Sequence, residues 1–179
     1  NRTIVGRGMY DRFVNYLLPN SQNKLKDGEK HPLIYTRNGF EVGAYLGPGT
    51  DLVNKIKTGV EPVTDVDKTA QAHDIRYHLA NSKEDVRAAD IKMIKALDMI
   101  QERGSDYKFN IYTGKLPMMA KMKLEDWGIA KPENFTSFGD VKPEDRQMME
   151  DKLSALAAEG YGRRGSCNIY DSYLRSYKV

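Results

Sequence analysis

Two consecutive helix-start signals constrain the fold of this chain more than any other feature of its sequence. In each signal, a hydroxyl residue that can cap a helix is followed three positions later by an acidic residue: Thr64 with Asp67, and Ser82 with Asp85. The signals predict helices over about residues 65–80 and 83–103, with Gly104 ending the second. Because only a short turn separates them, the two long helices must lie antiparallel.

Ionisable side chains fall on the apolar stripes of both predicted helices. On the first helix, His73 shares its three- and four-residue steps with four other side chains: Val66, Ala70, Tyr77 and Ala80. On the second helix, Asp90 interrupts an apolar stripe made of Val86, Met93, Ile94, Leu97 and Ile100. A carboxylate or imidazole in such a place costs desolvation free energy unless it is paired. We therefore expect His73 and Asp90 to contact each other across the helix pair.

A glycine-containing turn, Ala44 to Thr50, precedes the helix pair. Its Gly47 and Gly49 allow backbone angles that turn carbonyl groups toward one point, although an isolated Gly-Pro-Gly is more often only a tight turn. Calcium takes about six to eight oxygen ligands, which backbone carbonyls and one carboxylate can supply. Asp74 lies about 100° round the first helix from its neighbour His73. Its carboxylate and the turn are together candidates for such a site.

The remaining segments predict shorter elements. Helical spacing marks three segments: about residues 8–18, 116–127, and 143 to just before Gly160. Alternation predicts a short strand over 107–112. The polar segments 22–40 and 51–63 have no sustained period and are expected to be a loop or arm and a connector. The expected fold class is mainly α, with shorter helices at both ends of the helix pair.

Length and composition set further limits. At 179 residues the chain is long enough for one compact domain of ordinary size with an appended arm. Cys167 is its only cysteine, so no intramolecular disulfide can form. A net charge of +3 is too small to indicate nucleic acid. The tail, residues 161–179, mixes basic residues with tyrosines, but we expect it to contact protein rather than nucleic acid. The chain has no apolar run near the ~20 residues of a membrane span.

These pieces together suit metal-assisted ester hydrolysis. An imidazole held in one tautomer by a buried carboxylate can remove a proton from water. A cation beside it can polarise an ester carbonyl and stabilise the oxyanion. Because no serine or cysteine stands where a nucleophile is expected, water would be the nucleophile.

Over about residues 41–128 the sequence resembles the phospholipase A2 family, and most closely the phospholipase A2 domain of parvovirus minor capsid proteins. Tyr45-Leu46-Gly47-Pro48-Gly49 is similar to the calcium loop of that family, and His73-Asp74-x-x-Tyr77 to its catalytic helix motif. Further matching positions are Pro62, Asp67, Asp90 and the segment 121–128. Secreted members carry many disulfides, and their absence here agrees with the viral branch.

The resemblance implies a role for each site residue. Calcium would be bound by three carbonyls and one carboxylate: those of Tyr45, Gly47 and Gly49, and both oxygens of Asp74. His73 would be the general base and Asp90 would orient it. The Gly47 amide would bind the oxyanion, and Tyr77 would support the site by hydrogen bonding.

The resemblance also implies a function and a setting. We expect a calcium-dependent phospholipase A2 that hydrolyses the sn-2 ester of glycerophospholipids. It would be a virion component that breaches a host endosomal or other membrane during entry. The phospholipase A2-like core would span residues 41–128, and the arms 1–40 and 129–179 would contact other capsid subunits. The alternative is a minor capsid or cement protein that keeps the fold without turnover.

Overall fold

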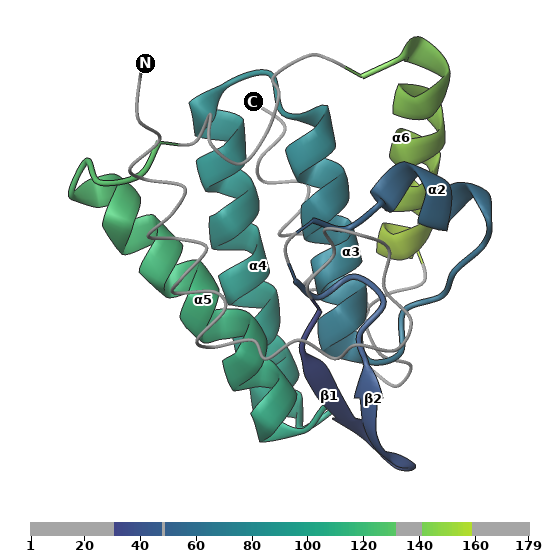
Figure 1. Cartoon of the computed structure of the whole chain (residues 1–179), viewed down its shortest axis with the longest axis vertical. Coiled ribbons are helices and arrows are strands. Elements are labelled where there is room, and N and C mark those ends of the chain that lie inside the picture. The colour runs from purple at the N-terminus through teal and green to yellow at the C-terminus, as the bar shows by residue number, and fades with distance from the viewer. Residues whose placement is uncertain (1–30, 48, 132–140, 159–179) are drawn as a thin grey trace.

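The computed structural model describes residues 31–47, 49–131 and 141–158, and its described part is mainly helical (Figure 1). In chain order the elements are β1 (Leu33–Thr36), β2 (Gly39–Val42), α2 (Leu52–Lys57), α3 (Asp65–Leu79), α4 (Lys83–Arg103), α5 (Lys108–Asp126) and α6 (Pro143–Ala158). The helix expected over residues 8–18 and the tail over 161–179 lie outside the described residues.

Helices α3 and α4 lie side by side, and the chain turns back between them over residues 80–82 (Figure 1). Both begin at the expected caps. The Thr64 side chain accepts a hydrogen bond from the Asp67 amide at 3.3 Å, and the Ser82 side chain accepts one from the Asp85 amide at 3.1 Å. Gly104 ends α4 in the left-handed conformation with φ of 62°. The predicted bounds of these two helices are therefore correct to within one residue.

The prediction of a strand over residues 107–112 is wrong, because α5 begins at Lys108. Within this segment Asn110 and Ile111 are buried, as is Gly114 one turn later, and this is the spacing of a helix face. The apparent alternation came from aromatic side chains on the exposed side: Tyr107, Phe109 and Tyr112. The helix predicted over 116–127 is thus the second half of a longer one.

Two expected loops contain regular structure. At the end of the segment 22–40, β1 pairs antiparallel with β2, which continues to Val42, and Gly39 has a φ of 103° at the turn between them. The hairpin packs on α5, where Asn110 exchanges two hydrogen bonds with the backbone of Tyr35, at 2.6 and 2.8 Å. Within 51–63, the short helix α2 packs against α3 and α6. Both elements are too short to show a period in the sequence.

The core lies between α3, α4 and α5 on one side of the molecule and α2, α3 and α6 on the other. Its largest fully buried apolar side chains are Ile34, Tyr45, Leu52, Ile75, Leu97, Ile111 and Met149. Gly114 on α5 faces the core, where a Cβ would lie at ordinary contact distance, 3.4 to 3.5 Å, from Leu97, Leu46 and Val66. Of the helices in the described ranges, none combines the length and apolar character needed to cross a membrane.

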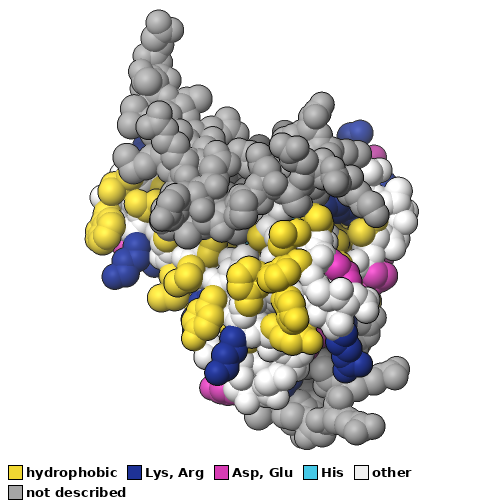
Figure 2. Space-filling model, turned by 60° about the horizontal axis from the view of Figure 1, so that its bottom comes forward, with side chains coloured by type: hydrophobic (Ala, Val, Ile, Leu, Met, Phe, Trp, Pro, Cys, Tyr) yellow, Lys and Arg dark blue, Asp and Glu magenta, His cyan; other side chains and the backbone are white. Residues whose placement is uncertain are grey.

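Aromatic side chains gather on the surface of the hairpin and the start of α5. Tyr35 contacts Phe40 and Tyr107 edge-on, with ring centroids 5.0 and 4.8 Å apart, and Phe40 contacts Phe109 at 5.6 Å. Figure 2 shows hydrophobic side chains collected on this end of the molecule. These edge-to-face contacts join the hairpin to α5 on its outer side.

Candidate active site

His73 on α3 faces Asp90 on α4 in the buried seam between the two helices. Nε2 of His73 lies 2.9 Å from Oδ1 of Asp90, and Asp90 has no exposed surface. Because an ionised carboxylate only accepts hydrogen bonds, Nε2 donates, and Nδ1 of the neutral ring carries the lone pair. That nitrogen lies 3.5 Å from Oδ1 of Asp74, which is too long for a good hydrogen bond. The geometry suits a base whose free nitrogen points toward the Asp74 side.

Asp90 has polar partners on both of its oxygens. The Tyr77 hydroxyl donates to Oδ1, the oxygen that His73 also contacts. The Lys121 ammonium group, on α5, donates to Oδ2 at 2.6 Å. Lys121 is itself only 2% exposed, so this ion pair is buried. Three helices therefore meet at one carboxylate.

The surroundings shift the pKa values of the pair in opposite directions. Burial by itself lowers the pKa of His73, but the Asp74 and Asp90 carboxylates beside the ring outweigh it and raise the pKa above 6.5. Burial by itself raises the pKa of Asp90, but the hydrogen bond from His73 and the positive charge of Lys121 lower it below 3.8. Asp90 is therefore a carboxylate at neutral pH.

Asp67, on the first turn of α3, binds the turn that precedes α2. Its buried carboxylate accepts backbone N–H bonds at 2.8 to 3.0 Å from four residues: Ala44, Tyr45, Leu46 and Val63. Sequence reasoning treated Asp67 only as a capping residue and a matching position. Its spacing from Thr64 explained its presence, so nothing indicated that its carboxylate reaches the turn.

The carbonyls of the turn converge. Oxygen atoms of Tyr45 and Gly47 lie 3.3 and 3.1 Å from the same Thr50 hydroxyl, which has only one proton to donate. Gly47 and Gly49 have φ values of 133° and 82°, which favour glycine. Burial raises the pKa of the Tyr45 phenol to about 12, and the negative charges of Asp67, Glu61 and Asp74 contribute.

The polar groups here fit a hard cation in their chemistry. Oδ2 of Asp74 is buried and has no hydrogen-bond partner among the described residues. The two converging carbonyls share a single hydroxyl proton, so one of them lacks that donor at any time. In the part of the chain that the structure describes, no three His, Cys, Asp or Glu side chains form a metal cluster. A calcium site here would depend on the carbonyls of the turn together with Asp74.

The structure brings several of the predicted site residues into contact. His73, Asp90 and Tyr77 are in direct contact, and Asp74 lies beside His73. Within the described ranges, the buried Oδ2 of Asp74 has no hydrogen-bond partner, Gly47 lies in the turn with a φ of 133°, and Gly49 is exposed.

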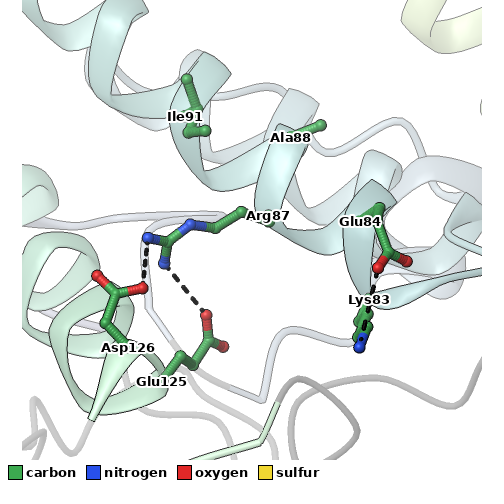
Figure 3. A pocket seen from close by; sticks show the side chains of 7 residues that line it. All are labelled: Lys83, Glu84, Arg87, Ala88, Ile91, Glu125 and Asp126. Carbon is green, nitrogen blue, oxygen red and sulfur yellow. Dashed lines mark hydrogen bonds and ion pairs between the residues drawn. The ribbon is translucent and has the colours of Figure 1, made fainter.

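Sequence reasoning missed Lys121 as a site residue, noting only the segment that begins with it. Lys121 also pairs at 2.6 Å with Glu125, whose other oxygen lies 3.5 Å from Arg87. Arg87 pairs with Asp126 at 2.8 Å, in a surface pocket between α4 and α5 lined by Lys83, Glu84, Arg87, Ala88, Ile91, Glu125 and Asp126 (Figure 3). The ion pairs thus extend from Asp90 to the surface. The four-residue spacing of Lys121 and Glu125, which is typical of an ion pair along a helix, was the one signal for these ion pairs in the sequence.

Comparison with known proteins identifies part of the chain. Residues 41–114 match the family model described as Phospholipase A2-like domain. No curated protein and no solved structure gives a significant match. The matched range contains the turn, α3, α4 and every residue predicted for the site. Over residues 41–114 this chain is therefore similar to phospholipase A2-like domains.

Proposed function

We propose that the protein is a calcium-dependent phospholipase A2 that hydrolyses the sn-2 ester of glycerophospholipids. The observation that carries this proposal is the buried pair of His73 and Asp90, beside an Asp74 oxygen that lacks a hydrogen-bond partner in the described structure. Well-packed apolar residues of similar volume often stabilise a helix seam as well as or better than buried charged groups do, so a purely structural domain has no need of an imidazole and two carboxylates there. The family match supports the same class of reaction.

Calcium would be bound by the carbonyls of Tyr45, Gly47 and Gly49 and by the carboxylate of Asp74. A bound calcium ion supplies a positive charge that polarises the ester carbonyl and stabilises an oxyanion. The Asp67 carboxylate holds the first part of this turn, because three of the four backbone N–H groups that donate hydrogen bonds to it belong to residues 44–46. The Gly47 amide would add a donor to the oxyanion.

His73 would act on water. Its free Nδ1 removes a proton as the water oxygen bonds to the sn-2 carbonyl carbon, and Asp90 stabilises the resulting imidazolium. When the ester C–O bond breaks, the imidazolium returns the proton to the leaving oxygen. The products are a fatty acid and a lysophospholipid. Tyr77 keeps Asp90 in place through its hydroxyl.

We also propose that the enzyme is a minor virion component acting at host endosomal or other membranes. The arms, residues 1–40 and 129–179, would contact neighbouring capsid subunits. This setting rests on the resemblance to parvovirus capsid proteins. Detection of the chain in purified particles, with antibody access only after particle opening, would test it.

Fatty-acid release from phosphatidylcholine vesicles tests the activity. Release should require calcium, stop in chelator, and fall at least about a hundredfold in His73→Ala, because a general base is lost. His78→Ala is the matched control, since His78 lies on the same helix and its ring nitrogen lies 3.1 Å from a backbone carbonyl, that of Asp74, rather than from a carboxylate. Activity that survives both chelator and His73→Ala contradicts the mechanism. No release at any calcium concentration favours the structural alternative.

A further inference from the structure

Lys121 is the most deeply buried lysine among the described residues, and its ammonium group lies at the candidate catalytic pair. Only 2% of the residue is exposed. A buried ammonium costs several kcal/mol of desolvation free energy unless anions surround it. Here two carboxylates do so, Asp90 and Glu125, each at 2.6 Å. The Lys121 nitrogen also lies over the ring of Tyr77, 5.4 Å from the ring centroid.

The contact divides the two oxygens of Asp90 between different partners. Lys121 occupies Oδ2, while His73 and Tyr77 both contact Oδ1. A carboxylate bound only through Oδ1 can rotate about its Cβ–Cγ bond, and both oxygens could then compete for His73. Holding Oδ2 removes that freedom and fixes the acceptor that His73 faces.

We propose that Lys121 is a positioning residue of the site. Through Oδ2 it fixes the Asp90 carboxylate, so that Oδ1 holds His73 with Nε2 protonated and Nδ1 free. Lys121 does not contact the reacting atoms in this scheme, and it acts through Asp90. The kinetic part of this inference rests on the proposed function, whereas the orientation of His73 does not.

The positioning role follows from where α5 crosses the helix pair. Lys121 comes from a helix that contributes neither His73 nor Asp90, so the contact that holds Oδ2 of Asp90 depends on the docking of α5. A second ion pair, Lys115 to Asp98, also joins α5 to α4, and both of its side chains are more exposed. This pair is a natural control for loss of an α5-to-α4 ion pair.

A double-mutant cycle tests the inference. Lys121→Met should lower kcat about tenfold or more with little change in KM, as loss of an orienting partner typically does. In an Asp90→Asn background the same change should alter kcat less than about twofold, because Lys121 no longer has a carboxylate to orient. Lys115→Met should leave kcat unchanged, and Lys121→Arg should recover part of the loss. An equal loss of kcat from Lys121→Met in both backgrounds would overturn the proposal.

A spectroscopic measurement keeps the inference testable without turnover. The nitrogen-15 shifts of His73 at alkaline pH, where the ring is neutral, report which ring nitrogen carries the proton. We expect the Nε2–H tautomer in the wild type and in Lys115→Met, and a mixture of tautomers in Lys121→Met. An unchanged tautomer in Lys121→Met contradicts positioning by Lys121. If the wild type shows this pattern but releases no fatty acid, the proposed function fails and the positioning role stands.

Loss of folding must be separated from loss of positioning. Lys121→Met leaves two buried carboxylates without their shared cation, which is costly. If the single variant Lys121→Met does not fold, the double variant Lys121→Met/Glu125→Gln takes its place in the mutant cycle and in the spectra. In the double variant, a neutral amide replaces one of the two buried carboxylates. Glu125→Gln alone should keep the wild-type tautomer and kcat, because Asp90 retains Lys121. A tautomer change in Glu125→Gln equal to that in the double variant would contradict the proposal.

Discussion

Asp67 shows how one side chain can organise a loop. Its fully buried carboxylate accepts hydrogen bonds from four backbone N–H groups, and without it these donors would lose this partner. The three amides of residues 44–46 belong to the turn, and the carboxylate belongs to α3. The turn is therefore attached directly to the helix that carries His73 and Asp74.

We predict that Asp67→Ala lowers the free energy of unfolding by about 3–5 kcal/mol, because several buried amides lose their acceptor. Asp85→Ala is the matched control, since Asp85 has the same position in the other capping box but is exposed. It should cost about 1 kcal/mol. Urea unfolding measures both. Equal losses would show that the amide contacts of Asp67 contribute nothing beyond capping.

His73 should give the calcium-free protein a pH-dependent stability. The carboxylates of Asp74 and Asp90 outweigh burial and raise the folded pKa of His73 above the 6.5 of the unfolded chain. The stabilisation is therefore fully present below about pH 6.5 and is lost as pH rises through the raised pKa. The difference in Tm between wild type and His73→Ala, measured in chelator, should shrink from about pH 6 to about pH 9. A difference that grows over this range would contradict the raised pKa.

Among single residues, those whose chemistry conflicts with their local pattern could be predicted from sequence. Asp90 interrupts an apolar stripe, so its pairing with His73 was expected, and the two lie 2.9 Å apart. Lys121 was not predicted, because a lysine on a helix is by default solvated. Its burial depends on how α5 crosses α3 and α4, which no local pattern records.

At the scale of elements, capping separates the helices that were predicted from those that were not. Helices α3 and α4 begin with a side-chain cap, and their bounds were correct to within one residue. Helices α2 and α5 follow the N-cap residues Asp51 and Tyr107, neither of which makes a side-chain cap hydrogen bond. Helix α2 lies in the segment predicted to be a connector, and the first turns of α5 lie in the segment predicted to be a strand. The start of α6 was found because Pro143 stands at its first position.

The packing of α5 can be tested at Gly114. Gly114→Ala should stabilise the protein by up to about 1 kcal/mol, because alanine favours the helix and its Cβ fits at ordinary contact distance from its nearest neighbours. Gly114→Val should cost about 1–3 kcal/mol, because its extra methyl groups would overlap Leu97, Leu46 or Val66. Urea unfolding of both variants distinguishes them. Equal stability of the two would mean that α5 does not pack this closely.

For the whole molecule, the fold class could be predicted but the arrangement could not. The mainly helical content follows from patterns within single segments. By contrast, the hairpin meets α5 through Tyr35 and Asn110, which are 75 residues apart. Contacts of this kind depend on the assembled shape of α3, α4 and α5. No periodicity in either segment predicts them.

Calcium should stabilise the whole domain. At a calcium concentration about a hundredfold above Kd, binding adds about 2.7 kcal/mol, which raises Tm by several degrees. Asp74→Ala should abolish this shift, whereas Asp98→Asn should keep it, because Asp98 is an acidic residue whose described ion pair is with Lys115. Thermal unfolding with calcium and with chelator measures the shift. A wild-type Tm that does not respond to calcium contradicts binding to the native state.

The reciprocal hydrogen bonds between Tyr35 and Asn110 also affect the order of folding. They close a loop that contains the turn, α3 and α4. Contacts within that loop, such as His73 with Asp90, are separated by 17 residues and cost less chain entropy to form. The pair can therefore assemble in an early helical hairpin, before α5 docks. Lys121 arrives only with α5, so the docking of α5 is also the step that would orient the base.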